Sequence, residues 1–130
     1  MSEGIYNLDV LKALVDIEIS RIKRYKKQQP FSIAFIYTPN IKDTDIATIL
    51  RTDLRSSDVI ASIEKDFVFV FLPETGKEGA YKFLNRINKK FTVKTVEGVV
   101  TYPEDGETSF ELFQKLFNVM KEKMLPTNDL

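Results

Sequence analysis

The charged residues best placed for chemistry lie between two apolar runs in the middle of the chain. Glu64, Lys65 and Asp66 separate the β-rich run Val59–Ile63 from the run Phe67–Leu72. Two such runs with a three-residue polar connection predict an antiparallel hairpin, with the charged residues at its tip. A charged tip of this kind is a suitable place for binding or catalysis. Two carboxylates are too few for a hard-cation site, so no metal is predicted there.

The composition narrows the chemistry that such a site could perform. The chain has no Cys and no His, which excludes a thiolate nucleophile and an imidazole base or metal ligand. Lys plus Arg and Asp plus Glu both number 19, so no overall field attracts nucleic acid or an anionic membrane. No apolar run reaches the roughly 18 residues of a membrane span, and no signal peptide is recognisable. We expect a cytoplasmic protein without a cofactor.

The rest of the chain supplies the elements that must position the hairpin. Its 130 residues predict a single domain, with a core over about residues 7–124. Apolar periodicity and capping residues predict, in order, a helix over Asn7–Lys27, a strand over Phe31–Tyr37, a helix over Asp43–Leu54, the hairpin, a helix capped by Thr75 and Glu78, a strand region over Phe91–Tyr102, and a helix capped by Thr108 and Glu111.

This order predicts the α+β class with a ferredoxin-like βαββαβ core, an antiparallel sheet with helices, and one additional N-terminal helix. Phe67–Leu72 is apolar at every position, which predicts a central strand that is buried on both faces. The N-terminal helix could cover the sheet or pair with another subunit. Many unrelated functions use this plan, so the function must be inferred from a site.

Three stretches of the sequence form a further pattern. They read Arg-Ser-Ser-Asp-Val-Ile-Ala (55–61) leading to Phe-Leu-Pro-Glu-Thr (71–75), Lys-Glu-Gly-Ala (77–80), and Glu-Gly-Val-Val-Thr-Tyr-Pro-Glu-Asp-Gly (97–106). Together they resemble the GGDEF domain of diguanylate cyclases over nearly the whole chain. The resemblance implies a bacterial signalling domain with the nucleotide-cyclase fold.

The sequence departs from that family at the positions that its catalysis uses. By spacing, the five signature positions are Glu64, Lys65, Asp66, Phe67 and Val68, so both signature glycines are absent and one acidic residue of the pair is left. The family's first-strand metal carboxylate would fall near position 37, a tyrosine, and the short segment that follows implies that one family helix is deleted. Phosphoryl transfer needs metal-bridging carboxylates and a phosphate cradle. These departures predict a degenerate domain that is not an enzyme, with no catalytic residue and no metal.

A second feature of the family is retained. Many GGDEF domains bind their product, cyclic di-GMP, at an inhibitory site marked RxxD, five residues before the signature. Arg55 and Asp58 stand at that spacing, and Arg86 matches a supporting arginine on the next helix. The resemblance therefore implies that Arg55, Asp58 and Arg86 bind cyclic di-GMP, because guanidinium and carboxylate groups can pair with phosphate and guanine edges. In the alternative, Arg55 and Asp58 satisfy each other or the local backbone.

Two other hypotheses stay open from the sequence. The domain could be a pseudo-enzyme that docks on a protein partner or forms a homodimer without a nucleotide ligand. It could also bind RNA as an RRM does, since residues 65–71 and 35–37 faintly resemble RNP strands. The run Phe67–Leu72 favours core packing instead, because it is apolar throughout.

Overall fold

The computed structural model describes residues 8–26, 29–39, 41–64, 66–92 and 94–128, so Asn7, Lys27 and Lys65 lie outside the described residues. Its elements, in chain order, are α1 (Leu8–Tyr25), β1 (Phe31–Tyr37), α2 (Asp43–Arg51), β2 (Val59–Glu64), β3 (Phe67–Leu72), α3 (Lys77–Asn88), β4 (Val96–Tyr102) and α4 (Ser109–Asn128). Among the described helices, none is long and apolar enough to cross a membrane.

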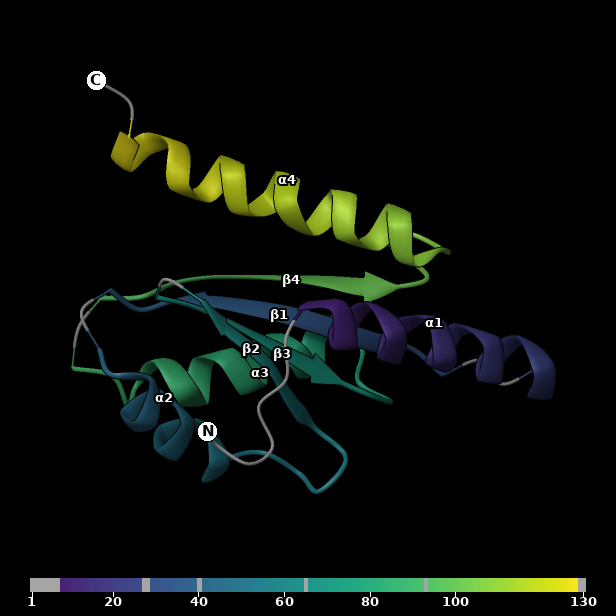
Figure 1. Ribbon diagram of the computed structural model, residues 1–130, viewed down its shortest axis with the longest axis horizontal. Coiled ribbons are helices and arrows are strands. Elements are labelled where there is room, and N and C mark those ends of the chain that lie inside the picture. The colour runs from purple at the N-terminus through teal and green to yellow at the C-terminus, as the bar shows by residue number, and fades with distance from the viewer. Residues whose placement is uncertain (1–7, 27–28, 40, 65, 93, 129–130) are drawn as a thin grey trace.

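The four strands form one sheet in the order β2-β3-β1-β4, and every neighbouring pair is antiparallel (Figure 1). This is the predicted α+β fold with a ferredoxin-like core. β3 lies between β2 and β1, and its residues 68–72 are all buried, which confirms the central strand predicted from its uninterrupted apolar run. In the described part of the chain, α2 is the one helix between β1 and β2.

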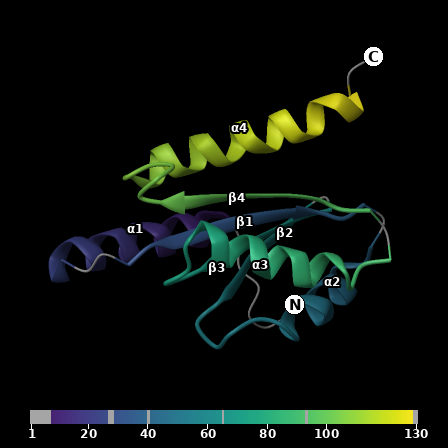
Figure 2. The same cartoon turned by 180° about the vertical axis from the view of Figure 1, so that it is seen from behind.

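Helices cover both faces of the sheet. This explains why apolar and polar residues alternate so little along its two central strands, β1 and β3. α2 and α3 pack on one face against Ala34, Ile36, Val68 and Val70. α1 and α4 pack on the other face, where the predicted buried stripe of α1 meets the alternate residues of the same strands, in a cluster that includes Leu11, Val15, Ile19, Phe35, Phe69 and Phe71. Figures 1 and 2 show α4 on one side of the sheet and α2 with α3 on the other.

The helix starts differ from the sequence prediction in their capping. α3 begins at Lys77 after the N-cap residue Gly76, which has no side chain to cap the helix, so the predicted capping box of Thr75 and Glu78 is wrong. At α4, Thr108 Oγ1 does accept the Glu111 N–H, at 3.1 Å, while Glu111 Oε1 accepts the N–H of residue 107 at 2.8 Å. The Thr75 hydroxyl is free for another role because it does not cap α3.

Candidate ligand-binding pocket

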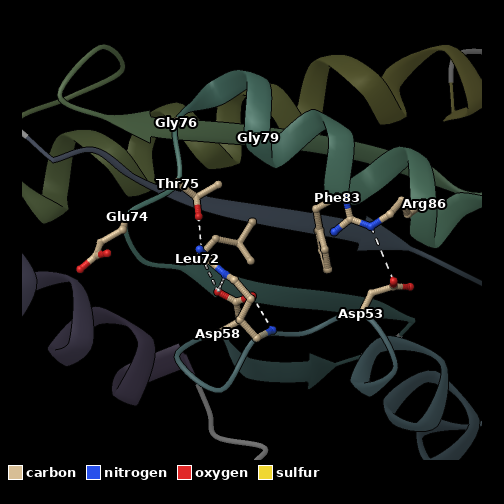
Figure 3. Close-up of a pocket in the computed structure, with 10 residues that line it drawn as sticks. Asp53, Asp58, Leu72, Glu74, Thr75, Gly76, Gly79, Phe83 and Arg86 are labelled. Carbon is tan, nitrogen blue, oxygen red and sulfur yellow. Dashed lines mark hydrogen bonds and ion pairs between the residues drawn. The ribbon is translucent and has the colours of Figure 1, made fainter.

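A pocket of about 300 Å³ opens beside α3 and brings the predicted site residues together (Figure 3). The connection from α2 to β2 contributes Asp53, Arg55 and Asp58, and α3 contributes Phe83 and Arg86. The end of β3 and the start of α3 complete the wall with Leu72, Glu74, Thr75, Gly76 and Gly79. Arg55 and Arg86 are therefore both present in one pocket.

Arg55 is fixed along one edge of its guanidinium group. Its Nη2 donates to Asp58 Oδ1 at 2.8 Å, to the Pro73 carbonyl at 2.7 Å and to Thr75 Oγ1 at 2.6 Å. Its Nε lies 3.1 and 3.2 Å from the two carboxylate oxygens of Asp58. Hydrogen bonding to Asp58 raises the pKa of Arg55 further above its ordinary value, so this side chain is a cation at every relevant pH.

The other edge of the Arg55 guanidinium group is open. Within the part of the chain that the structure describes, Nη1 has no hydrogen-bond partner, and the side chain is 52% exposed. Asp58 is different, because its side chain is only 3% exposed and its Oδ2 also accepts the backbone N–H of Arg55 at 2.9 Å. The pair thus satisfies itself and the local backbone, as the alternative in the sequence analysis allowed, while Arg55 keeps donors that a ligand can reach.

The wall that holds Arg55 is anchored to the sheet. The Thr75 carbonyl accepts a hydrogen bond from the buried Ser32 Oγ at 2.8 Å. Lys77 Nζ, at the start of α3, lies 2.6 Å from Asp105 in the turn after β4. Because these contacts join α3 to β1 and to the β4 turn, the pocket is built on the rigid part of the fold.

Arg86 lies on the far side of the pocket beside Asp53. Its Nε is 3.6 Å from Asp53 Oδ1, and its guanidinium carbon is 6.0 Å from the centre of the Phe83 ring. Figure 3 shows Leu72 and Phe83 between the Asp58 side of the pocket and Arg86. The pocket therefore combines two arginines and an apolar floor with the carboxylates of Asp53, Asp58 and Glu74. The arginines can pair with phosphates, and the floor can pack against flat bases.

The Asp53 carboxylate makes the stability of the fold depend on pH. The ammonium group of Lys90, 2.5 Å from Oδ2, lowers the pKa of Asp53, although burial opposes the shift. A lowered folded-state pKa stabilises the fold above the unfolded value of about 3.9, and this stabilisation is lost as the pH falls through the folded value. We expect Asp53→Asn to reduce stability at pH 7 by at most about 1 kcal/mol, and less below pH ~4.

Urea unfolding of both proteins between pH 7 and pH 2 measures this difference. Lys90→Met removes the partner of Asp53 and serves as the matched variant, with a similar loss at pH 7. If the difference in free energy of unfolding between wild type and Asp53→Asn stays constant down to pH 2, the lowered pKa of Asp53 is contradicted.

The sequence analysis did not identify several residues of this pocket. Asp53 lies near the end of the helix predicted over residues 43–54, and Phe83 lies in the helix predicted after Thr75. The fold brings both residues into one pocket with Arg86. Thr75 was predicted only as a helix cap. Such side-chain contacts between distant segments leave no periodic signal in the sequence.

The five signature positions at the hairpin tip do not line the pocket. Val68 is fully buried and Phe67 packs against Tyr37, with ring centres 4.9 Å apart, so these two signature positions belong to the core. Asp66 stands in the left-handed region with φ 75° and its carbonyl accepts the N–H of Thr38 at 2.8 Å. The side chain of Glu64 and all of Lys65 lie outside the described residues. Among the residues that are described, no three carboxylates lie close enough to hold a metal ion.

The structure also bears on the RNA-binding hypothesis. RRM domains stack bases on exposed aromatic residues of the sheet. Here Phe35, Phe69 and Phe71 are buried in the cluster under α1 and α4. No open aromatic platform of that kind exists in the described part of the sheet.

The comparisons with known proteins concern the fold. No family model and no curated protein matches the sequence. Among solved structures, the GGDEF domain of YfiN (TpbB) from Pseudomonas aeruginosa is 18% identical, with a TM-score of 0.75 over 92% of this chain and 84% of that one. A diguanylate cyclase from Thermotoga maritima is 21% identical, with a TM-score of 0.68 over 88% and 94%. The active GGEEF domain of a Vibrio cholerae diguanylate cyclase is 16% identical, with a TM-score of 0.69 over 92% and 93%.

These similarities contradict the prediction that the chain is not an enzyme, because structures with its fold include diguanylate cyclases, one of them an active domain. That prediction rested on the five signature positions, on the tyrosine at position 37 and on the shortened segment that follows it, all matched to the family by spacing. Spacing does not fix which groups a folded hairpin presents. The sequence still supplies carboxyl groups at Glu64 and Asp66. The chain has the fold of the GGDEF domains of diguanylate cyclases.

Proposed function

We propose that the chain is a bacterial cytoplasmic signalling domain that binds cyclic di-GMP in the pocket between Arg55 and Arg86. The observation that carries the proposal is the meeting of these two arginines in one pocket with an apolar floor. They come from different segments, and the resemblance to the family had named both of them as ligand residues.

Each wall of the pocket offers a contact that suits a cyclic dinucleotide. The open Nη1 edge of Arg55 and the guanidinium group of Arg86, which is 55% exposed, can donate to phosphate or guanine oxygens. Phe83 and Leu72 offer an apolar surface to a base. Gly76 stands at the start of α3 without a side-chain cap, where a helix dipole favours an anion. The ligand thus finds donors and an apolar surface in one place.

Asp58 acts in this proposal as a positioning residue. Its carboxylate is almost fully covered and holds the Nε edge of Arg55, so Nη1 is the edge that faces a ligand. On the other side of the pocket, Asp53 forms a longer ion pair with Arg86, at 3.6 Å from its Nε. The two carboxylates orient the arginines before the ligand arrives, which reduces the entropy that binding would otherwise cost.

Isothermal titration with cyclic di-GMP tests the proposal. We expect binding by the wild type, and a loss of affinity of about 10- to 100-fold in Arg55→Ala and in Arg86→Ala, because each removes charge-assisted hydrogen bonds. Arg24→Ala, on α1 and outside the lining of the pocket, is the matched control and should bind like the wild type. Asp58→Asn should weaken binding less than Arg55→Ala.

The protein must be free of nucleotide before the titration, because a protein with the fold of a cyclase could carry its own product. The guanine absorbance of an acid extract of the purified protein checks this and reports bound ligand directly. No heat at high micromolar cyclic di-GMP with nucleotide-free protein, or equal heats for wild type and Arg55→Ala, would overturn the proposal.

A further inference from the structure

Arg55 and Arg86 present different hydrogen-bonding edges to the pocket that they share. A guanidinium group has two forks, each made of donors on two nitrogens: Nε with Nη2, and Nη1 with Nη2. A fork matches two acceptors that lie side by side, such as O6 and N7 of guanine. A single nitrogen is enough to bind one oxygen of a phosphate. The edges that stay open therefore decide which part of a ligand each arginine can bind.

Both forks of Arg55 are occupied by the protein itself. Asp58 takes the fork of Nε and Nη2, with its two carboxylate oxygens at 2.8 to 3.2 Å from these nitrogens. The second hydrogen of Nη2 faces the Pro73 carbonyl at 2.7 Å and Thr75 Oγ1 at 2.6 Å, so the fork of Nη1 and Nη2 lacks one of its donors. The Thr75 hydroxyl donates to the Pro73 carbonyl at 2.9 Å, which leaves its oxygen to accept from Arg55. In the described part of the chain, Nη1 is the nitrogen of Arg55 that stays open to a ligand.

The Asp58 carboxylate is closed to a base as well. Both of its oxygens meet the Arg55 side chain, and Oδ2 also accepts the backbone N–H of Arg55 at 2.9 Å. The Asp58 side chain is 3% exposed. A carboxylate that reads guanine must reach the N–H groups at the edge of the base, and a covered carboxylate cannot. The pair of Arg55 and Asp58 thus offers a base neither a fork nor a carboxylate.

Arg86 differs from Arg55 because its fork is open. Its Nε lies 3.6 Å from Asp53 Oδ1, which is too far for a hydrogen bond, and among the described residues its Nη1 and Nη2 have no hydrogen-bond partner. The side chain is 55% exposed, and its guanidinium carbon lies 6.0 Å from the centre of the Phe83 ring (Figure 3). A flat base that packs against Phe83 lies within reach of this fork.

We propose that the two arginines divide the recognition of a cyclic dinucleotide between them. Arg55 donates from Nη1 to an oxygen of a phosphodiester group and does not read the base, whereas the fork of Arg86 reads O6 and N7 of a guanine. This inference rests on the proposed function, and it adds which part of the ligand each arginine selects. Arg55 by itself accepts any cyclic dinucleotide, and the preference for guanine depends on Arg86.

A cyclic dinucleotide with 7-deazaguanine in place of guanine tests this division, because it lacks N7 and keeps both phosphodiesters. Isothermal titration compares it with cyclic di-GMP for the wild type, Arg55→Ala and Arg86→Ala. We expect the loss of N7 to weaken binding about 10-fold in the wild type and in Arg55→Ala, but under ~2-fold in Arg86→Ala, which no longer has the group that reads N7. Arg24→Ala, outside the lining of the pocket, should behave like the wild type.

The closed forks of Arg55 can also be measured without a ligand. In nuclear magnetic resonance of the free protein, the Nε–H of Arg55 should exchange with water at least ~10-fold more slowly than that of Arg86, because a hydrogen bond protects an N–H group from exchange. Equal exchange rates would mean that Asp58 does not hold Arg55, and they would overturn the division even if cyclic di-GMP binds.

The titrations separate a failure of this inference from a failure of the proposed function. The inference alone is overturned if cyclic di-GMP binds but the wild type does not distinguish the two ligands, if Arg55→Ala no longer distinguishes them, or if Arg86→Ala still distinguishes them about 10-fold. If nucleotide-free wild type binds no cyclic di-GMP, the proposed function fails and the inference fails with it. Circular dichroism confirms that each variant is folded.

Discussion

Replacing Leu116 with alanine is expected to lower the free energy of unfolding by about 2 to 5 kcal/mol. Leu116 is fully buried on α4, in the cluster that α1 and α4 form with Phe35, Phe69 and Val100 on the sheet. Removing its side chain leaves a cavity in close-packed surroundings that relax only in part. α4 would then be shown to be an integral layer of the core and not an appendage.

The adjacent residue provides the control. Phe117 follows Leu116 in the same helix but is 46% exposed, so Phe117→Ala should cost under about 1 kcal/mol. Urea unfolding of both variants measures the two losses. Equal losses for the two variants would show that α4 packs differently from the arrangement described here.

The fold could be predicted in large part because its signals are local and periodic. β1 and β3 were predicted with the bounds that the structure has, since each is an apolar run ended by a proline or a polar turn. The stripe Leu11, Val15, Ile19 and Ile22 on α1 was visible at helical spacing and is buried. The Thr75 capping box was wrong because the sequence does not show that Arg55 and the Pro73 carbonyl engage this hydroxyl.

The candidate site could be predicted only through the resemblance to the GGDEF family. That resemblance named Arg55, Asp58 and Arg86, and the structure places all three in one pocket. The burial of Asp58 depends on how the 55–58 turn packs, which no spacing encodes. The prediction that the chain is not an enzyme was wrong for a related reason: it took a function from a few aligned positions, whereas the comparisons show a fold shared with cyclases.

Gly98→Ala is expected to destabilise the fold by about 1 to 3 kcal/mol, although it adds a single methyl group. Gly98 lies on β4 directly opposite Phe35 in the register with β1. A Cβ at this position would lie 2.4 Å from Phe35 Cε2 and 2.9 Å from a methyl carbon of Val119 on α4. Phe35 is fully buried and cannot swing away, so the strain must be spread over β4 and α4.

Thermal unfolding compares this variant with Gly76→Ala, where the new Cβ would meet only Pro30 Cγ, at an ordinary 3.7 Å. We expect a clear fall in Tm for Gly98→Ala and little change for Gly76→Ala, since both glycines have backbone conformations that alanine can adopt. Adding Phe35→Leu to Gly98→Ala should cost less than Phe35→Leu costs in the wild type, because the smaller side chain relieves the overlap. Additive losses would mean that the ring of Phe35 does not lie over Gly98, and the close packing between β4, β1 and α4 would have to be revised.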